Sequence, residues 1–320
     1  MALYDSAFVV FDDSVEKIFG TSPSLELLHE NAEYPFAHEA GVFVQEDNSL
    51  FITSNQFTDP RTELRRIQIT RVLLANDGKN VECEEINPDH VPMANGGVNY
   101  KDGVLFCAQG TQDRPGGLAF MASRPPYTSH LMLSSFHGRD FNSVNDVVIH
   151  SDGSIWFTDP IYGFEQGFRP KPRLPCQVYR FDPARNSVRV IADGFGDQMD
   201  IVNLLLHRNL KSVADYTSSY AFDIVNYSGQ PFLTNRRVFA MADTGIPDGI
   251  KCDVHGNVYS GCGDGINIWS AGGVLIGKIV IDGGVANFCF GREGTIYILN
   301  EHRLWRAQLA SSTKGALLGI

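Results

Sequence analysis

Short polar turns followed by runs of apolar residues recur along the chain. In each copy a pair such as Asp-Gly, His-Gly or Glu-Gly precedes a β-branched or aromatic segment. Such a pair before an apolar run indicates a hairpin, because the turn needs a residue with positive φ. The turn centres are Asn48, Gly103, Gly153, Asn209, Gly256 and Gly294, of which Asn209 belongs to a degenerate copy.

The spacing of these turns is about 40 to 55 residues, which is the period of four-stranded propeller blades. We therefore predict an all-β fold, a six-bladed β-propeller with a central axial pocket, as a single domain over residues 1–320. The segments between turns carry almost no amphipathic helical pattern, apart from a short helix expected near Ser14 to Phe19. A pair of β-sandwiches is the structural alternative.

Composition and charge narrow the class of partner. The formal net charge is −11 and no run of basic residues occurs, so we expect no nucleic-acid partner. The N-terminus carries acidic residues where a signal peptide needs basic and apolar ones, and no apolar run is long enough to span a membrane. We therefore expect a cytoplasmic protein with no membrane partner, in which the six cysteines are reduced.

Polar residues next to the repeated strands are the candidates for chemistry. His38 and Glu39 precede the first strand, Asn145 precedes the third, and Asp200 and Asp248 lie in later copies. Taken singly, each has a plain structural explanation, such as a turn at Asp248 or a surface position for His38. Taken together, oxygen donors from several blades suit a hard cation in a propeller channel, whereas no His/Cys cluster indicates zinc.

The segments that carry these residues resemble a known family. HEAGVF, FNSVNDVV, PDGIKCDVHGNVY and GGVANFCF, with others between them, are similar to the fungal lactonase branch of the regucalcin–gluconolactonase family over nearly the whole chain. The resemblance implies an axial divalent cation, usually calcium. It also implies that Glu39 and Asp248 are ligands, with Asn145 as a neighbouring contact to substrate or water.

One segment departs from the family pattern. Where the family has a Pro-Asn-Gly motif whose asparagine binds the cation, this chain reads GFGDQMDI from Gly194 to Ile201. Either Met199 or Asp200 takes the asparagine position, depending on the direction of counting. A thioether does not suit calcium, whereas a carboxylate does.

The resemblance and this departure leave three functions open, two enzymatic and one of binding. The first, which the departure favours, is that of fungal hetero-Diels–Alderases, which resemble the family and act in secondary metabolism. They dehydrate a benzylic alcohol to an o-quinone methide and control its cycloaddition. This function needs an apolar small-molecule substrate, one acid and no cofactor. The acid would be one of Glu39, Asp248, Asp200 and His38, and the predicted substrate-binding residues are Asn145, Tyr100, Tyr162, Phe164 and Met199.

The alternative is a lactone hydrolase that depends on calcium or another divalent cation held by Glu39, Asp248 and Asp200. A propeller that binds other molecules without catalysis is the third interpretation.

Overall fold

The computed structural model describes residues 6–75, 80–194, 200–202, 211–215 and 218–320. Helix in this part is limited to a 3-10 turn, Asp13–Val15, and two single-turn helices, α1 (Glu16–Phe19) and α2 (Tyr162–Glu165). The all-β class and the short helix near residues 14–19 are therefore confirmed. The chain divides into two compact units, a central unit, Asn31–Ile201, and a terminal unit, Met1–Glu30 with Val202–Ile320. That residues 1–320 form a single domain stays a prediction.

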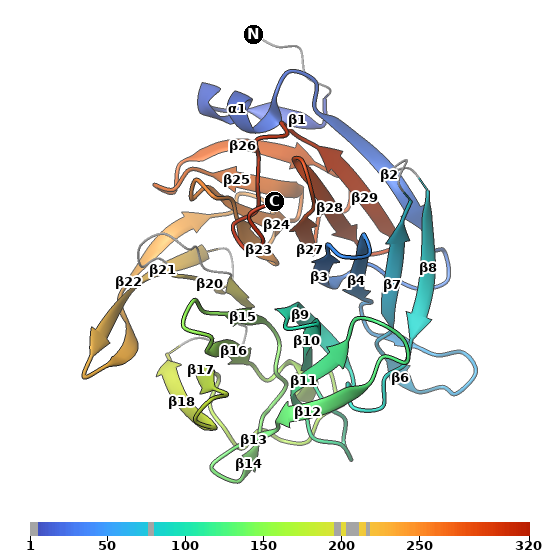
Figure 1. The fold of residues 1–320 in the computed structure, drawn as a ribbon, viewed down its shortest axis with the longest axis vertical. Helices are drawn as coiled ribbons and strands as arrows, with labels where there is room; N and C mark the ends of the chain where they lie inside the picture. Colours follow the sequence, from blue (N-terminus) through green and yellow to red (C-terminus); the bar gives the residue numbers. More distant parts are fainter. Residues whose placement is uncertain (1–5, 76–79, 195–199, 203–210, 216–217) are drawn as a thin grey trace. The chain divides into compact units, whose positions relative to one another are not determined.

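The central unit contains three antiparallel four-stranded sheets, whose strand order can be followed in Figure 1. The first has the order β3 (Glu39–Val44), β4 (Ser49–Thr53), β7 (Ile69–Leu74), β8 (Val81–Ile86). The second is β12 (Ser129–Leu133), β11 (Gly117–Ala122), β10 (Gly103–Ala108), β9 (Ala94–Tyr100). The third is β15 (Val147–Ile149), β16 (Ile155–Asp159), β17 (Gln177–Asp182), β18 (Ser187–Ala192). Two small hairpins are β5 (Phe57–Thr58) with β6 (Arg65–Arg66), and β13 (Ser135–Phe136) with β14 (Arg139–Asp140).

The terminal unit combines strands from both ends of the chain. Its five-stranded sheet has the order β1 (Phe8–Val10), β26 (Leu275–Val280), β25 (Gly265–Trp269), β24 (Val258–Cys262), β23 (Ile250–Cys252). A four-stranded sheet follows as β2 (Ser24–Glu30), β29 (Arg303–Gln308), β28 (Thr295–Asn300), β27 (Asn287–Phe290). A further sheet is β19 (Asp200–Val202), β20 (Lys211–Asp215), β21 (Ser218–Tyr227), β22 (Gln230–Met241), and the boundary between the units falls within β19.

The prediction of a six-bladed propeller is wrong: the described residues form five blades of four strands each, together with one sheet of a different make-up. Within the described residues five sheets have four strands, and the sheet of β23 to β26 has a fifth, β1. The apolar run Phe8–Val10 pairs with β26, placing Phe8 opposite Ile279, because an edge strand offers unpaired backbone groups to a neighbouring segment. The turn periodicity could not detect this strand, since β1 carries no turn marker of its own.

The turn markers themselves behave largely as predicted. Asn48, Gly153, Gly256 and Gly294 have φ values of 51°, 81°, 91° and 77°. In the second copy the left-handed residue is Lys101, with φ 51°, rather than Gly103. The marker at Asn209 lies outside the described residues.

An aromatic cluster supports the third sheet of the central unit. The rings of Phe157 and Tyr179 are stacked 5.4 Å apart, and Phe141 meets both edge-on with centroids at 5.2 Å. Phe141 is 1% exposed and begins the segment 141–146. The core therefore holds one end of the segment that contains Asn145.

Candidate functional site

Four polar residues occupy the same place in successive copies of the repeat. Asn145 and Asp248 lie eight residues before the turn centres Gly153 and Gly256, and Glu39 lies nine before Asn48. Asn95 lies at the same offset from Gly103 and was not among the predicted site residues. Each of these four copies thus places a polar side chain near the beginning of the first strand of the copy.

In the central unit these residues form a buried polar cluster. The Nδ2 of Asn95 donates to Oδ1 of Asn145 at 2.7 Å, and the hydroxyl of Thr53 donates to the carbonyl of Asn95 at 3.0 Å. Glu39 is the cross-strand partner of Thr53, and Gln109 approaches Oδ1 of Asn95 at 3.5 Å. All five residues are less than 10% exposed. We call this set the Asn95 cluster: Glu39, Thr53, Asn95, Gln109 and Asn145.

Glu39 owes its position to a bulge in β3. Ala40 lies opposite Ile52 and Val42 opposite Phe51, so Gly41 is an extra residue, and both Ala40 and Gly41 have φ 66°. A bulge of this kind redirects the side chain beside it. Oε2 of Glu39 accepts from the Ala40 N–H at 3.3 Å, and Glu39 is only 5% exposed.

The donor chemistry of the Asn95 cluster fits a hard divalent cation. A buried carboxylate is costly unless its charge is compensated, and carboxylate and amide oxygens are the ligands that calcium prefers. Among the described residues no group of three or more His, Cys, Asp or Glu side chains is arranged as a metal site. The cluster has one carboxylate together with amides, so the cation would be held by Glu39 and amide oxygens.

Asp159, the last residue of β16, binds the segment before Asn145. Its Oδ2 accepts from the Asn142 N–H and its Oδ1 from the Ser143 N–H, both at 2.9 Å. Thr158, its neighbour, exchanges backbone hydrogen bonds with Asn145 and Asp146 at 3.1 Å, and its hydroxyl accepts from the Asp146 N–H at 3.1 Å. Asp159 and Thr158 are fully buried.

Arg169 holds the other side of the same segment. Its guanidinium donates to the carbonyls of Phe141 at 2.7 Å and Asn142 at 2.8 Å. The guanidinium also donates to the backbone carbonyls of Thr111 at 2.7 Å and Arg114 at 3.0 Å, both in the loop after β10. Arg169 is 4% exposed, so it links two loops from inside the protein.

Burial dominates the electrostatics around the segment. It raises the pKa of Asp159 to about 7, although the Asn142 and Ser143 N–H groups and the charge of Arg169 act in the opposite direction. Burial also raises the pKa of the Cys107 thiol well above its usual value, and the carboxylates of Asp146, Glu39 and Asp159 raise it further. These carboxylates therefore lie close enough to act on one thiol in β10.

Asp248 lies in the terminal unit and is half-buried. Its N–H donates to the carbonyl of Gly261 at 2.8 Å, and the next residue, Gly249, donates to Ala286 at 2.8 Å. A Cβ at Gly249 would lie 2.3 Å from Cγ of Asn287, so the backbone passes directly against that amide. That Asp248 joins Glu39 and Asn145 at one site stays a prediction.

The remaining predicted residues are dispersed. His38 is half-buried beside Glu39, and its N–H donates to the Thr53 carbonyl at 3.0 Å. Tyr100 packs edge-on against Phe120 at the opposite end of β9 from Asn95, about 16 Å along the strand, so β9 does not bring it next to Asn145. Asp200 begins β19, but its side chain and all of Met199 lie outside the described residues.

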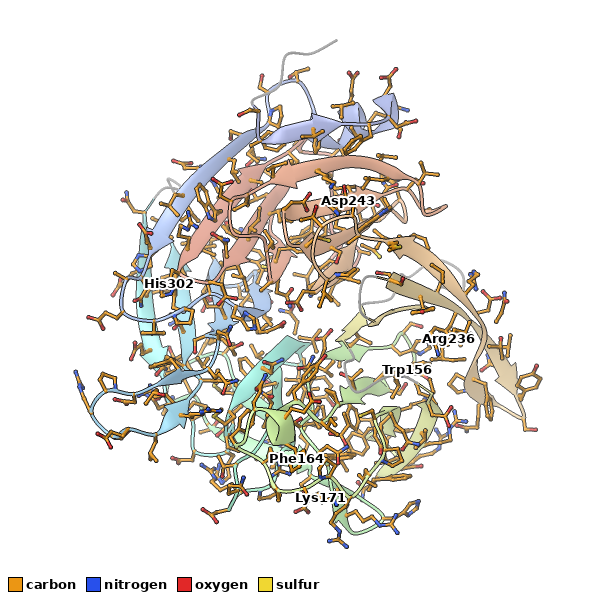
Figure 2. The ribbon with its side chains drawn as sticks, turned by 180° about the vertical axis from the view of Figure 1, so that it is seen from behind. Trp156, Phe164, Lys171, Arg236, Asp243 and His302 are labelled. Atoms are coloured by element: carbon orange, nitrogen blue, oxygen red, sulfur yellow. The ribbon has the colours of Figure 1, made fainter. Side chains whose placement is uncertain are left out.

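The aromatic residues Tyr162 and Phe164 lie on α2. Gly163 between them donates its N–H to the Ser143 hydroxyl at 3.0 Å, which ties the helix to the Asn145 segment. Tyr162 is half-buried, whereas Phe164, labelled in Figure 2, is 44% exposed. Both were predicted to contact substrate, and this stays a prediction.

A cleft of about 550 Å³ lies between the β5–β6 hairpin and the end of α2. Arg65 donates to the carbonyl of Gln166 across it, and Oε1 of Gln56 is buried without a hydrogen-bond partner among the described residues. The cleft is lined by Gln56, Phe57, Thr58, Arg65, Glu165 and Gln166. Its wall is thus mainly polar, with Phe57 as the one aromatic ring in that set.

Comparison with known proteins identifies the family. Residues 114–302, more than half of the chain, match the SMP-30/Gluconolactonase/LRE-like region. The chain belongs to this family. A lactonohydrolase of Aspergillus oryzae, oryL, is 25% identical over 325 residues, which cover 90% of this chain and 70% of that protein. A gluconolactonase of Zymomonas mobilis is 25% identical over 327 residues, covering 93% of this chain and 85% of that protein.

Solved structures of two other proteins have a similar fold. The gluconolactonase XC5397 of Xanthomonas campestris has a TM-score of 0.76 at 22% identity, covering 94% of each chain. A calcium-binding regucalcin of Agrobacterium tumefaciens has a TM-score of 0.63 at 12% identity, covering 92% of this chain and 95% of that one. The family match confirms the predicted resemblance to the regucalcin–gluconolactonase family, and the solved structures confirm the all-β propeller fold. No helix within the described residues is long and apolar enough to cross a membrane.

The sequence pattern did not indicate several residues that bind the segment of Asn145. Asn95 could have been found from its constant offset to the turn, because that offset also selects Asn145 and Asp248. Asp159 and Arg169 had no such signal. Asp159 looks like an ordinary strand end before a proline, and Arg169 lies in an irregular loop 27 residues after Asn142, to which it donates.

Proposed function

We propose that the protein is an enzyme that hydrolyses lactones at a site that includes the Asn95 cluster. The observation that carries this proposal is a buried carboxylate, Glu39, whose cross-strand partner Thr53 donates to the carbonyl of Asn95, the residue that binds Asn145. The family and two relatives, a gluconolactonase and a lactonohydrolase, support it. The reaction adds water to the lactone carbonyl carbon and breaks the ring C–O bond, which gives a hydroxy acid.

The chain's own residues bind and orient the substrate. The hydrogen bond from Nδ2 of Asn95 to Oδ1 of Asn145 fixes the orientation of the Asn145 side chain. Glu39 and amide oxygens of the Asn95 cluster would hold a divalent cation. When bound, the cation supplies Lewis acidity toward a carbonyl and lowers the pKa of water. The polar cleft beside α2 offers room for the rest of the substrate.

The test is lactone opening by the purified protein, followed with a pH indicator for glucono-δ-lactone and a panel of larger lactones. We expect a chelator to abolish turnover and added calcium to restore it. Glu39→Gln should lower kcat/KM by at least about 100-fold, because it removes a charged donor. Glu46→Gln, an exposed position beyond the far end of β3, is the matched control and should not change turnover. Turnover that is absent for every lactone, or that is insensitive to Glu39→Gln, contradicts the proposal.

Cycloaddition is the second candidate, and two specific features favour it. The segment 194–201 carries Met199 and Asp200 where the family has an amide motif. Phe164, which immediately precedes the cleft residue Glu165 in the chain, is 44% exposed. This function would take an apolar substrate and need no cofactor.

An assay of adduct stereoisomers distinguishes cycloaddition from lactone hydrolysis. A benzylic alcohol that forms an o-quinone methide is supplied with an alkene partner, and the stereoisomers of the adduct are quantified with and without protein. Enrichment of one isomer that survives a chelator and is lost in Phe164→Ala supports cycloaddition. Product ratios that equal those without protein contradict it.

A further inference from the structure

The segment 141–146 is held in one conformation by groups that cannot touch a substrate. Asp159 is fully buried, and both of its carboxylate oxygens accept backbone N–H groups of this segment. Hydrogen bonds from backbone N–H groups to a carboxylate are charge-assisted and stronger than those to a neutral acceptor. The two bonds end three and two residues before Asn145, at Asn142 and Ser143.

Other contacts leave the segment little freedom. The hydroxyl of Ser143 donates to the Pro160 carbonyl at 2.8 Å and accepts from Gly163, while the Asn142 amide donates to the Leu174 carbonyl at 3.0 Å. The carbonyls of Phe141 and Asn142 are bound by Arg169. Asp159 is the only acidic side chain among these described contacts that binds the segment's N–H groups.

We propose that Asp159 is a positioning residue for Asn145: its carboxylate fixes the segment 141–146 so that the Asn145 amide has the orientation the reaction needs. This inference rests on the proposed lactonase function for its catalytic consequence, but its structural part does not.

The charge state of Asp159 follows from the groups around it. Arg169 from the α2–β17 loop contributes positive charge, whereas Tyr179 on β17 and Cys107 on β10 are kept neutral because burial and nearby carboxylates, including Asp159, raise their pKa values. The ionised carboxylate accepts both N–H groups, and protonation turns one oxygen into a weaker acceptor. We therefore expect the segment to loosen as the pH falls through about 7.

The experiment compares Asp159→Asn with Asp182→Asn. Asp182 is a close match: it ends β17 in the same sheet, is 8% exposed, and accepts from the N–H groups of Ala184 and Arg185. It lies at the opposite end of the sheet from Asp159, because β16 and β17 are antiparallel. Hydrogen exchange of residues 141–146 is measured by mass spectrometry, together with kcat, KM and their pH dependence on glucono-δ-lactone.

For Asp159→Asn we expect exchange in 141–146 to accelerate by about ten-fold, because one N–H loses its acceptor. We expect kcat to fall by about ten- to 100-fold with a smaller change in KM, since misplacement of a positioned group mainly affects the transition state. In the wild type we expect kcat to fall as the pH drops through about 7, and this pH dependence should be absent in Asp159→Asn. Asp182→Asn should change none of these quantities.

The outcomes separate this inference from the proposed function. If exchange in 141–146 is unchanged by Asp159→Asn, or if Asp182→Asn changes it equally, the positioning role is wrong whatever the activity. If exchange accelerates while kcat and its pH profile stay at wild-type values, the role in the reaction is wrong. A wild-type protein that opens no lactone contradicts the proposed function, while the exchange data still decide whether Asp159 holds the segment.

Discussion

The segments that contain Asn145 and Asp248 occupy the same place in the repeat but are held by different means. In the central unit, side chains hold the segment 141–146: Asp159 binds its N–H groups and Arg169 its carbonyls. In the terminal unit, backbone bonds and close packing hold Pro247 to Gly249, with Gly249 against the amide of Asn287. The first arrangement depends on charge and therefore on pH, whereas the second depends on the space that a glycine leaves.

The largest expected effect concerns the pH dependence of stability in the central unit. The pKa of the Asp159 carboxyl is about 7 in the folded protein, and near 4 in an unfolded chain. Because the folded value is higher, the folded protein binds more protons between these values, and the free energy of unfolding falls as the pH rises from about 4 to about 7.

Protonated Asp159 contributes at most about 4 kcal/mol to the free energy of unfolding at low pH. This contribution is lost when the carboxyl ionises at high pH. Urea unfolding of the wild type and Asp159→Asn at several pH values measures it as the change in their difference. A difference that does not vary with pH would show that Asp159 does not titrate in this window.

Removal of the guanidinium that binds the same segment comes next. Arg169→Met leaves buried carbonyls of both loops without their donor, so we expect a loss of about 3 kcal/mol in the free energy of unfolding. Arg185→Met is the control, because Arg185 is a 73% exposed partner of Asp182 and such pairs contribute less than about 1 kcal/mol. Equal losses in the two variants would mean that the guanidinium of Arg169 does not hold the loops.

In the terminal unit the corresponding change is steric. Gly249→Ala would force the Asn287 side chain away from its bonds to the Phe288 N–H at 2.8 Å and the Lys251 amine at 3.3 Å. We expect a loss of about 2 kcal/mol that does not vary with pH. Denaturant unfolding of Gly249→Ala, Asn287→Ala and the double variant tests this, since the double variant should lose less than the sum of the single losses. Additive losses would contradict the contact.

The smallest expected effect isolates one neutral hydrogen bond. Thr158→Val keeps the shape of the side chain but removes the oxygen that accepts from the Asp146 N–H. We expect a loss of about 1 kcal/mol, again independent of pH, measured by the same unfolding experiment. A loss as large as that of Arg169→Met would place the main support of the segment at Thr158 instead.

Much of the fold could be predicted from the chain because the strand signals are local. A positive-φ residue at Asn48 or Gly153 followed by an apolar run is visible within a few residues, and it locates hairpins without knowledge of their neighbours. The same repeat placed Glu39 and Asn145 at the beginnings of their sheets. The strand β1 was missed because its pairing with β26 joins segments about 270 residues apart, and no local pattern encodes such a pairing.

The sequence by itself determined the repeat, the strand content and the types of polar side chain in each copy, since each depends on residues close together in the chain. Only the tertiary structure decided that Asn95 binds Asn145 and that Asp159 and Arg169 enclose the segment before it. The physical reason is burial: a carboxyl and a guanidinium become strong supports, with altered pKa values, when the folded core removes water from them. The composition of the chain and the spacing of its residues do not indicate which side chains lose contact with water in the fold.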